Sequence, residues 1–226
     1  LPEWVSLEHK VQEILTQQEI HGWRFDEAAA WKLTSALRQE LQNTEELLRR
    51  KHPFVRGGEF TPKRDNRTQG YVKGAPITRL KEFNPTSRDH ISWILQTFYG
   101  WTPTQLTTTG KPIIDEVVLK EIGSEISTMF LRCLTVTKML GQISEGTNAW
   151  LKLCTTNGRL HHHCSVSTNT HRCAHRNPNL AQVNSDERFR SLFIASKGQV
   201  MVGADLSGIE LRMLAHYLSR YDNGRY

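Results

Sequence analysis

The sequence predicts a mixed α/β fold, in which a mostly helical region (1–148) is followed by the beginning of a sheet-based region (149–226). Apolar residues recur at helical spacing through most of the first region. In the second region, an Asn-Gly pair at 157–158 lies between two short strand-like runs, which favours a hairpin. The apolar run 199–204 then indicates a buried strand followed by a helix.

Four helices are predicted in the first region. Asp26 and Ser87 are suitable N-caps for the second and third of them. The helices are expected near residues 7–15, 27–50, 88–98 and 124–142. The residues at helical spacing in the first are Leu7, Val11, Ile14 and Leu15, and those along one face of the second are Leu33, Leu37, Leu41 and Leu48. The inward positions of the other two are Ile91, Ile94, Leu95 and Phe98, and Ile126, Phe130, Cys133, Leu134 and Leu140.

Residues 51–82 differ from the helices around them. They are rich in Gly, Pro, Lys and Arg, so we predict a long, basic and irregular connection. A second loop, 100–112, is rich in Gly, Thr and Pro.

The net charge of +6 is unevenly distributed. Residues 51–112 hold ten Lys and Arg against four Asp and Glu, and residues 151–226 hold ten against five. Two basic blocks suit a polyanion such as a nucleic-acid backbone, although a solvated basic surface without a partner explains the charge equally well.

Cysteine spacing and hydropathy argue against a disulfide-stabilised protein and against a membrane protein. The four cysteines form no CxxC pair, so we expect no disulfide framework. No apolar run is long enough to span a membrane, and we expect a reducing, cytoplasmic setting with no membrane partner.

The segment 205–212, Asp-Leu-Ser-Gly-Ile-Glu-Leu-Arg, carries the clearest chemistry. A carboxylate such as Asp205 at the end of a buried strand suits a hard cation like Mg²⁺. In the structural alternative, Asp205 or Ser207 caps the helix and Glu210 complements its dipole. The pattern leaves both interpretations open.

This segment, together with the residues around it, resembles motif A of the A-family DNA polymerases, in particular the phage replicative branch. The resemblance implies a right-hand architecture, of which this chain holds the thumb (1–148) and the first half of an antiparallel-sheet palm (149–226). It implies that Asp205 and the Leu206 carbonyl bind catalytic Mg²⁺, and that Glu210 excludes ribonucleotides. The implied nucleotide-binding residues are Leu206, Ser207, Gly208, Ile209 and Glu210.

Upstream stretches extend the resemblance. Thr170-His171-Arg172 and 177–182 resemble the family stretch in which an Arg contacts the minor groove at the primer terminus. Arg172, Asn179 and Gln182 are the implied DNA-binding residues. His171 replaces a family Gly, so we expect this loop to be rebuilt locally.

The stretch 83–91 resembles the family thumb motif Phe-Asn-Pro-x-Ser. A helix N-terminus with Ser87 and Arg88 is suited to phosphate. The implied backbone-binding residues are Asn84, Ser87, Arg88, Lys111 and Lys138. By position, 51–82 is either a shortened thumb insertion for a processivity protein or a loop that touches DNA.

Several parts of such an enzyme are absent from the 226 residues, among them the fingers helix and the second metal-binding Asp. Since a two-metal site needs carboxylates from two segments, we expect activity only with a second polypeptide that carries the fingers and the C-terminal palm. The chain is then a split-polymerase subunit or a fragment. Its partners would be primer-template DNA, dNTP and a separate exonuclease or processivity protein, in the host cytoplasm if it is viral.

Two alternatives from other classes stay open, a non-catalytic DNA-binding module and a zinc-stabilised interaction domain. His161, His162, His163 and Cys164, with Cys173 and His175, supply enough N and S ligands for zinc. Their spacing fits no regular finger, and neighbouring strand residues face opposite ways, so no zinc is expected.

Overall fold

The computed structural model describes residues 2–170 and 172–225 and divides into two compact units. The larger unit extends to Phe193, and the smaller unit runs from Ile194. The division predicted at residue 148 remains a prediction. Buried side chains from both sides of it, such as Val136 and Trp150, share one hydrophobic core.

The helices predicted from apolar spacing are present, and the described chain adds several short ones. The helices are α1 (Glu3–His21), α2 (Glu27–Lys51), α3 (Arg88–Tyr99), α4 (Glu116–Ile122), α5 (Glu125–Leu140), α6 (Trp150–Leu153), α7 (Glu187–Arg190) and α8 (Ile209–Asp222), with a π-helical turn η1 (Gly141–Glu145) and a 3-10 turn η2 (Leu180–Gln182). The strands are β1 (Trp23–Arg24), β2 (Phe54–Phe60), β3 (Ile77–Glu82), β4 (Arg159–Leu160), β5 (His163–Ser165) and β6 (Ala174–Arg176).

Side-chain caps fix where the long helices begin. The Asp26 carboxylate accepts a hydrogen bond from the Ala29 N–H at 2.9 Å and starts α2, as predicted. Ser124 and Ser127 form a reciprocal capping box at the start of α5. The prediction that Phe98 is buried is wrong. It is 56% exposed, because it lies in the last turn of α3 at the edge of an aromatic group with His52 and Trp93.

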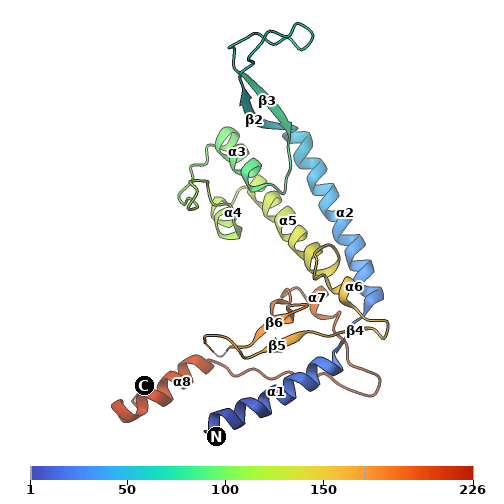
Figure 1. The fold of residues 1–226 in the computed structure, drawn as a ribbon, viewed down its shortest axis with the longest axis vertical. Coiled ribbons are helices and arrows are strands. Elements are labelled where there is room, and N and C mark those ends of the chain that lie inside the picture. Colours follow the sequence, from blue (N-terminus) through green and yellow to red (C-terminus); the bar gives the residue numbers. More distant parts are fainter. Residues whose placement is uncertain (1, 171, 226) are drawn as a thin grey trace. The chain divides into compact units, whose positions relative to one another are not determined.

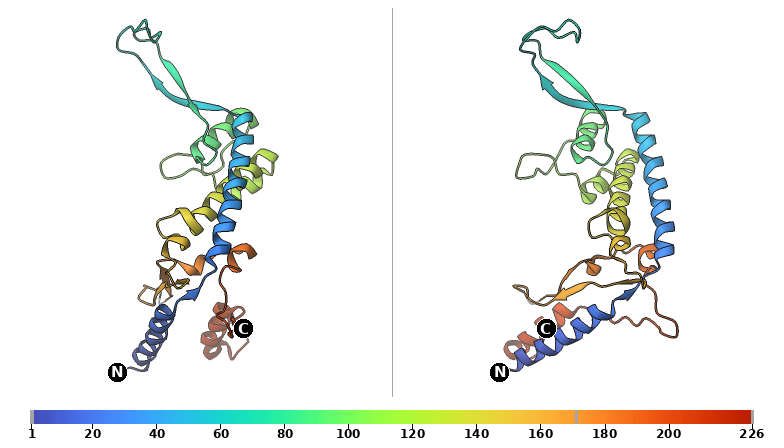
Figure 2. Two further views of the ribbon diagram at one scale, coloured as in Figure 1. Left: turned by 90° about the vertical axis from the view of Figure 1, so that its right-hand side faces the viewer. Right: turned by 45° about the vertical axis from the view of Figure 1, so that its right-hand side comes forward.

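Helices α2 and α5 lie side by side in the larger unit, as Figure 1 and both views of Figure 2 show. Two hydrophobic cores form along this pair. One gathers Leu48, Ile91, Ile94, Phe130 and other buried residues around α3 and α5. The other gathers Leu37, Val136, Trp150, Leu160 and Phe189. The pair therefore connects the helical region to the strands that follow it.

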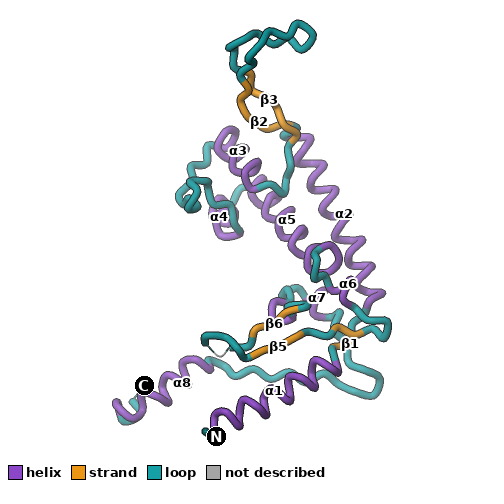
Figure 3. The backbone as a smooth tube through the Cα atoms, in the orientation of Figure 1, coloured by secondary structure: helices purple, strands orange, loops and turns teal. Residues whose placement is uncertain are grey.

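The segment predicted as an irregular connection is a β-hairpin. Strands β2 and β3 pair antiparallel, with an irregularity between Arg56 and Glu59. A Cβ at Gly57 would lie 2.6 Å from the Arg79 carbonyl oxygen, so the close pairing needs glycine there. Glycine and proline hide the alternation that reveals a strand, which is why the sequence reading missed the hairpin. Only the tip, 61–76, is loop (Figure 3).

The Asn-Gly turn at 157–158 is present, but the predicted hairpin around it is wrong. The Thr155 N–H donates to the Arg159 carbonyl at 2.9 Å, which closes the turn. Residues 150–153 form α6 rather than a strand, and Trp150 is buried in the core shared with Phe189. Strand β4 pairs instead with β1, far away in the sequence.

The buried strand predicted at 199–204 is not formed. Val200 and Val202 are 84% and 85% exposed. Extended backbone needs a neighbouring strand to satisfy its N–H and C=O groups, and none of the described strands pairs with this segment. No helix in the described residues is both long enough and apolar enough to cross a membrane.

Candidate nucleic-acid interface and metal-binding carboxylate

The predicted phosphate site at the start of α3 is a tightly built turn. The Ser87 hydroxyl accepts from the His90 N–H at 3.5 Å, and the Asn84 side-chain Oδ1 accepts from the Thr86 N–H at 2.9 Å. The Asn84 and Ser87 side chains therefore order the turn. Lys111, from the loop 100–112, makes an ion pair with Asp89 at 2.6 Å. Both partners are exposed, and such a pair contributes little stability that would keep Lys111 from a phosphate.

Arg88 and Lys138, which are far apart in the sequence, line one surface pocket of about 450 Å³ between α3, α4 and α5. The acidic residues of the pocket already have partners. Asp115 caps α4, and Lys120 donates to Glu116 at 2.7 Å, which lowers the pKa of Glu116. The Arg88 and Lys138 side chains make no hydrogen bond or ion pair with another described residue, and the Lys138 charge also lowers the pKa of Glu116. The structure thus brings together two predicted DNA-binding cations that no ion pair neutralises.

The predicted primer-terminus residues lie on and after the β5–β6 hairpin. The Arg172 carbonyl accepts from the Thr168 hydroxyl at 2.8 Å, which closes the hairpin loop. Asn179 caps η2 through a bond from the Ala181 N–H at 3.1 Å. The Gln182 carbonyl accepts from Gln142 at 2.7 Å and thereby ties η2 to η1. The predicted effect of His171 lies outside the described residues.

Asp205 lies in the smaller unit, in the non-helical segment before α8. The N-cap of α8 is Gly208, whose φ of 61° is left-handed, and no side chain caps the helix. The structural alternative, in which Asp205 or Ser207 caps the helix, is therefore wrong. No hydrogen bond or ion pair joins Asp205 to another described residue. Glu210 lies in the first turn of α8, as predicted.

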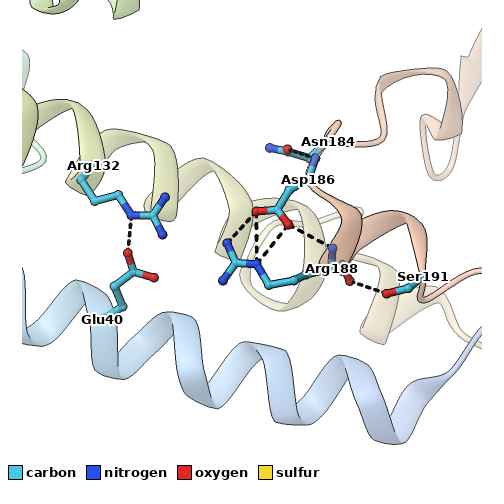
Figure 4. A network of polar contacts seen from close by, with 6 residues as sticks. All are labelled: Glu40, Arg132, Asn184, Asp186, Arg188 and Ser191. Carbon is cyan, nitrogen blue, oxygen red and sulfur yellow. Dashed lines mark hydrogen bonds and ion pairs between the residues drawn. The ribbon is translucent and has the colours of Figure 1, made fainter.

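Two groups of polar contacts that the sequence did not predict lie near each other, one around Asp186 and one between α2 and α5 (Figure 4). Arg188 donates to the Asp186 carboxylate at 2.6 Å, and this bond lowers the pKa of Asp186. Arg132 of α5 donates to Glu40 of α2 beside them, and the Arg132 charge also helps to lower the pKa of Asp186. The sequence signal was an Asp before a short polar helix, which is common and says nothing about its long-range neighbours.

Comparison with known proteins places this geometry in a family. The sequence matches DNA polymerase family A over residues 65–222. It is 32% identical to the DNA-directed DNA polymerase of Escherichia phage T7 over 291 aligned residues, which cover 99% of this chain and 40% of the relative. For the same enzyme of Enterobacteria phage T3 the identity is 33% over 288 residues, with the same coverage of each chain.

Solved structures agree on the fold. The POL domain of Pol1 from M. smegmatis, in complex with DNA primer-template and dNTP, matches with a TM-score of 0.69 at 20% identity. The match covers 94% of this chain and 34% of that one, and it confirms the predicted fold class, a mixed helix and sheet fold of the right-hand polymerase type. The chain spans about 40% of the length of its phage relatives. Because the family match covers well over half of its residues, the chain belongs to DNA polymerase family A.

Proposed function

We propose that the chain supplies the thumb and the first half of the palm of a DNA-directed DNA polymerase, with Asp205 as a ligand of its catalytic Mg²⁺. One observation carries the assignment of Asp205. The helix after it begins at Gly208 without a side-chain cap, and this carboxylate makes no hydrogen bond or ion pair with another described residue. An exposed carboxylate without a partner, within a family motif, is best explained by a ligand.

The oxygen atoms of this segment fit Mg²⁺. Asp205 offers a carboxylate, and the Leu206 carbonyl accepts no hydrogen bond from a described residue. Mg²⁺ prefers such oxygen ligands and supplies electrostatic stabilisation to phosphoryl transfer when it is bound. Asp205 and Leu206 would hold it, and Glu210, one turn further on, would close the site to a ribose 2′-hydroxyl.

A second polypeptide with the fingers and the remaining palm completes the proposed enzyme. The smaller unit exposes a run of large apolar side chains: Val200, Met201, Val202, Leu206, Ile209, Leu211, Met213, Leu214, Tyr217 and Tyr221. Apolar surface at this density marks an interface. Strand partners for 199–204 and a second carboxylate for the metal pair would come from the same polypeptide.

Primer extension with Mg²⁺ tests the assignment of Asp205. The chain is mixed with a polypeptide that carries the fingers and C-terminal palm, and dNTP incorporation is measured. We expect Asp205→Ala to lower the rate about 1000-fold, the scale seen when a group that stabilises the transition state is lost. Asp222→Ala, at the other end of α8, is the matched control and should retain activity. Equal rates for wild type and Asp205→Ala would refute the metal-ligand role.

A non-catalytic DNA-binding module is the second candidate, because all of the proposed DNA-binding residues lie in the larger unit and Asp205 does not. Binding to primer-template as a function of salt tests the interface that both candidates share. Each phosphate contact contributes about 0.9 to the slope of log K against log salt. Arg88→Ala and Lys138→Ala should each reduce the slope by about that amount. Lys32→Ala, an exposed cation of α2, should leave it unchanged.

A further inference from the structure

The hairpin β5–β6 sorts a run of histidines and cysteines onto two faces. Successive residues of a strand point to opposite sides. His161 and His163 contact Glu19 of α1, at 2.8 Å to its carbonyl and 2.9 Å to its carboxylate. Cys164 pairs with His175 across the hairpin, and Cys173 lies directly before β6, two residues before His175. The register therefore places Cys164 and His175 on the face that α1 does not cover, and the Cys173 sulfur lies close to both.

The three ligand atoms of this face lie within 4.8 Å of one another. The Cys164 Sγ is 4.0 Å from the His175 Nε2. Zn²⁺ with ordinary bond lengths and tetrahedral angles would separate sulfur from nitrogen by about 3.6 Å and sulfur from sulfur by about 3.8 Å. Movements of a few tenths of an ångström to about 1 Å would then bring all three atoms into coordination.

We propose that Cys164, Cys173 and His175 form a zinc site, with water as the fourth ligand. Two thiolates and an imidazole are the ligand types that select zinc over Mg²⁺. Two protons leave the thiols as the two Zn–S bonds form, and no electron is transferred. This revises the expectation of no zinc, which took the alternation of strand faces to separate the ligands. The register of β5 and β6 instead brings Cys164 and His175 to the same face.

The surroundings of the site also suit a metal. The ring of buried His162 stacks on the His175 ring, with centroids 5.5 Å apart and planes 14° apart. The Nδ1 atoms of both rings are buried and have no hydrogen-bond partner among the described residues. The His175 Nε2 makes its one hydrogen bond among the described residues with the Cys164 sulfur, a proposed ligand of the same metal, and stacking limits how the ring can turn.

A disulfide is the competing chemistry for the same pair of cysteines. Both thiols are free in the structure. A disulfide would join the two sulfurs directly and leave His175 without a role, whereas zinc uses all three side chains.

The position of the site gives it a structural role. Cys164 and Cys173 lie on either side of the loop that carries Arg172, so a metal between them would fix the base of that loop. Metal binding itself does not depend on the proposed polymerase function. The role of the loop at the primer terminus does, and activity is therefore not the readout of the test.

The zinc content of the full chain tests the proposal. The chain is expressed in medium that contains zinc, purified, and analysed for bound metal. We expect about one zinc per chain, and an intense thiolate-to-cobalt absorption band when Co²⁺ replaces it. Cys173→Ser should weaken binding more than about 100-fold, beyond the 10- to 100-fold typical of losing a group that only supports a ligand. Cys154→Ser, a free thiol elsewhere, and His163→Gln, on the opposite face, should each keep the metal.

Several outcomes would overturn the site. These are a wild-type chain without zinc and without the thiolate band, retention of the metal by Cys173→Ser, and loss of two free thiols to a Cys164–Cys173 disulfide in the purified chain. Circular dichroism of each variant verifies folding, so a metal-free variant with native helix content still supports the proposal.

Discussion

The two compact units of the chain differ in whether they contain a buried core, although α1 of the larger unit, like α8 of the smaller one, buries none of its residues. In residues 2–193, two cores bury large side chains such as Phe130 and Trp150 completely or almost so. In residues 194–225, α8 buries none of its residues, and Leu211 is 62% exposed. Burial of apolar surface is the main favourable term in folding, so the larger unit provides for its own stability. The smaller unit, taken by itself, has no core that buries α8.

The largest expected difference between the units lies in core truncation. Phe130→Ala removes a fully buried ring and should lower the free energy of unfolding by about 3–5 kcal/mol. Leu211→Ala removes a side chain that is already in water, and its effect should stay within about 0.5 kcal/mol. Urea denaturation of both variants measures the contrast. A comparable loss for Leu211→Ala would mean that α8 is packed in solution.

Amide hydrogen exchange gives a second measure of the same contrast. A helix of 14 residues without tertiary packing is marginal in water, so the amides of α8 should exchange quickly. Amides in the middle of α5 should exchange at least about 100-fold more slowly, because they open only with the core. Addition of the polypeptide with the fingers and remaining palm should slow exchange in α8 and leave α5 unchanged. Strong protection of α8 in the isolated chain would contradict the interface proposal.

Helices were predictable because their signals are local. The caps Asp26 and Ser87, and the spacing of residues such as Ile91 and Phe130, act within a few residues of one another. Strand partners are not local. Strand β4 pairs with β1, more than a hundred residues earlier, and no sequence period identifies that partner. The unpaired segment 199–204 is the opposite case, since its apolar pattern predicted a strand whose partners the described chain does not contain.

The candidate site likewise combines features that are local in the sequence with features that depend on long-range packing. The motif at 205–212 and the basic residues were visible one by one, whereas the pocket that joins Arg88 to Lys138 depends on how α3 and α5 pack. The two faces of the His and Cys run depend on the register of β5 and β6, which the spacing alone left undetermined. The Asp186 network required the same kind of long-range information.

Charge also stabilises the larger unit, by a smaller amount. The bond from Arg188 lowers the pKa of Asp186, so the pair stabilises the fold above the unfolded pKa of about 4. That contribution is lost as pH falls through the lower, folded pKa. Asp186→Asn keeps a capping oxygen and should cost about 1 kcal/mol at pH 7, since Arg188 is half-exposed. Urea denaturation from pH 7 to pH 3 should show the two proteins converging. A difference that persists at pH 3 would assign the effect to packing.

The smallest expected effect is on stability, and it concerns two aspartates that each precede a helix. It distinguishes an aspartate with a structural role from one with a functional role. Asp26 caps α2, and Asp26→Ala should cost about 1 kcal/mol of stability. Asp205 precedes α8, yet Gly208 is the cap, so Asp205→Ala should change stability by less than about 0.5 kcal/mol. Thermal unfolding of both variants provides the measurement, and Asp26→Ala sets its scale. A loss for Asp205→Ala as large as that for Asp26→Ala would give the carboxylate a structural role. An unchanged stability, combined with lost primer extension, would leave metal binding as the explanation for this residue in the motif.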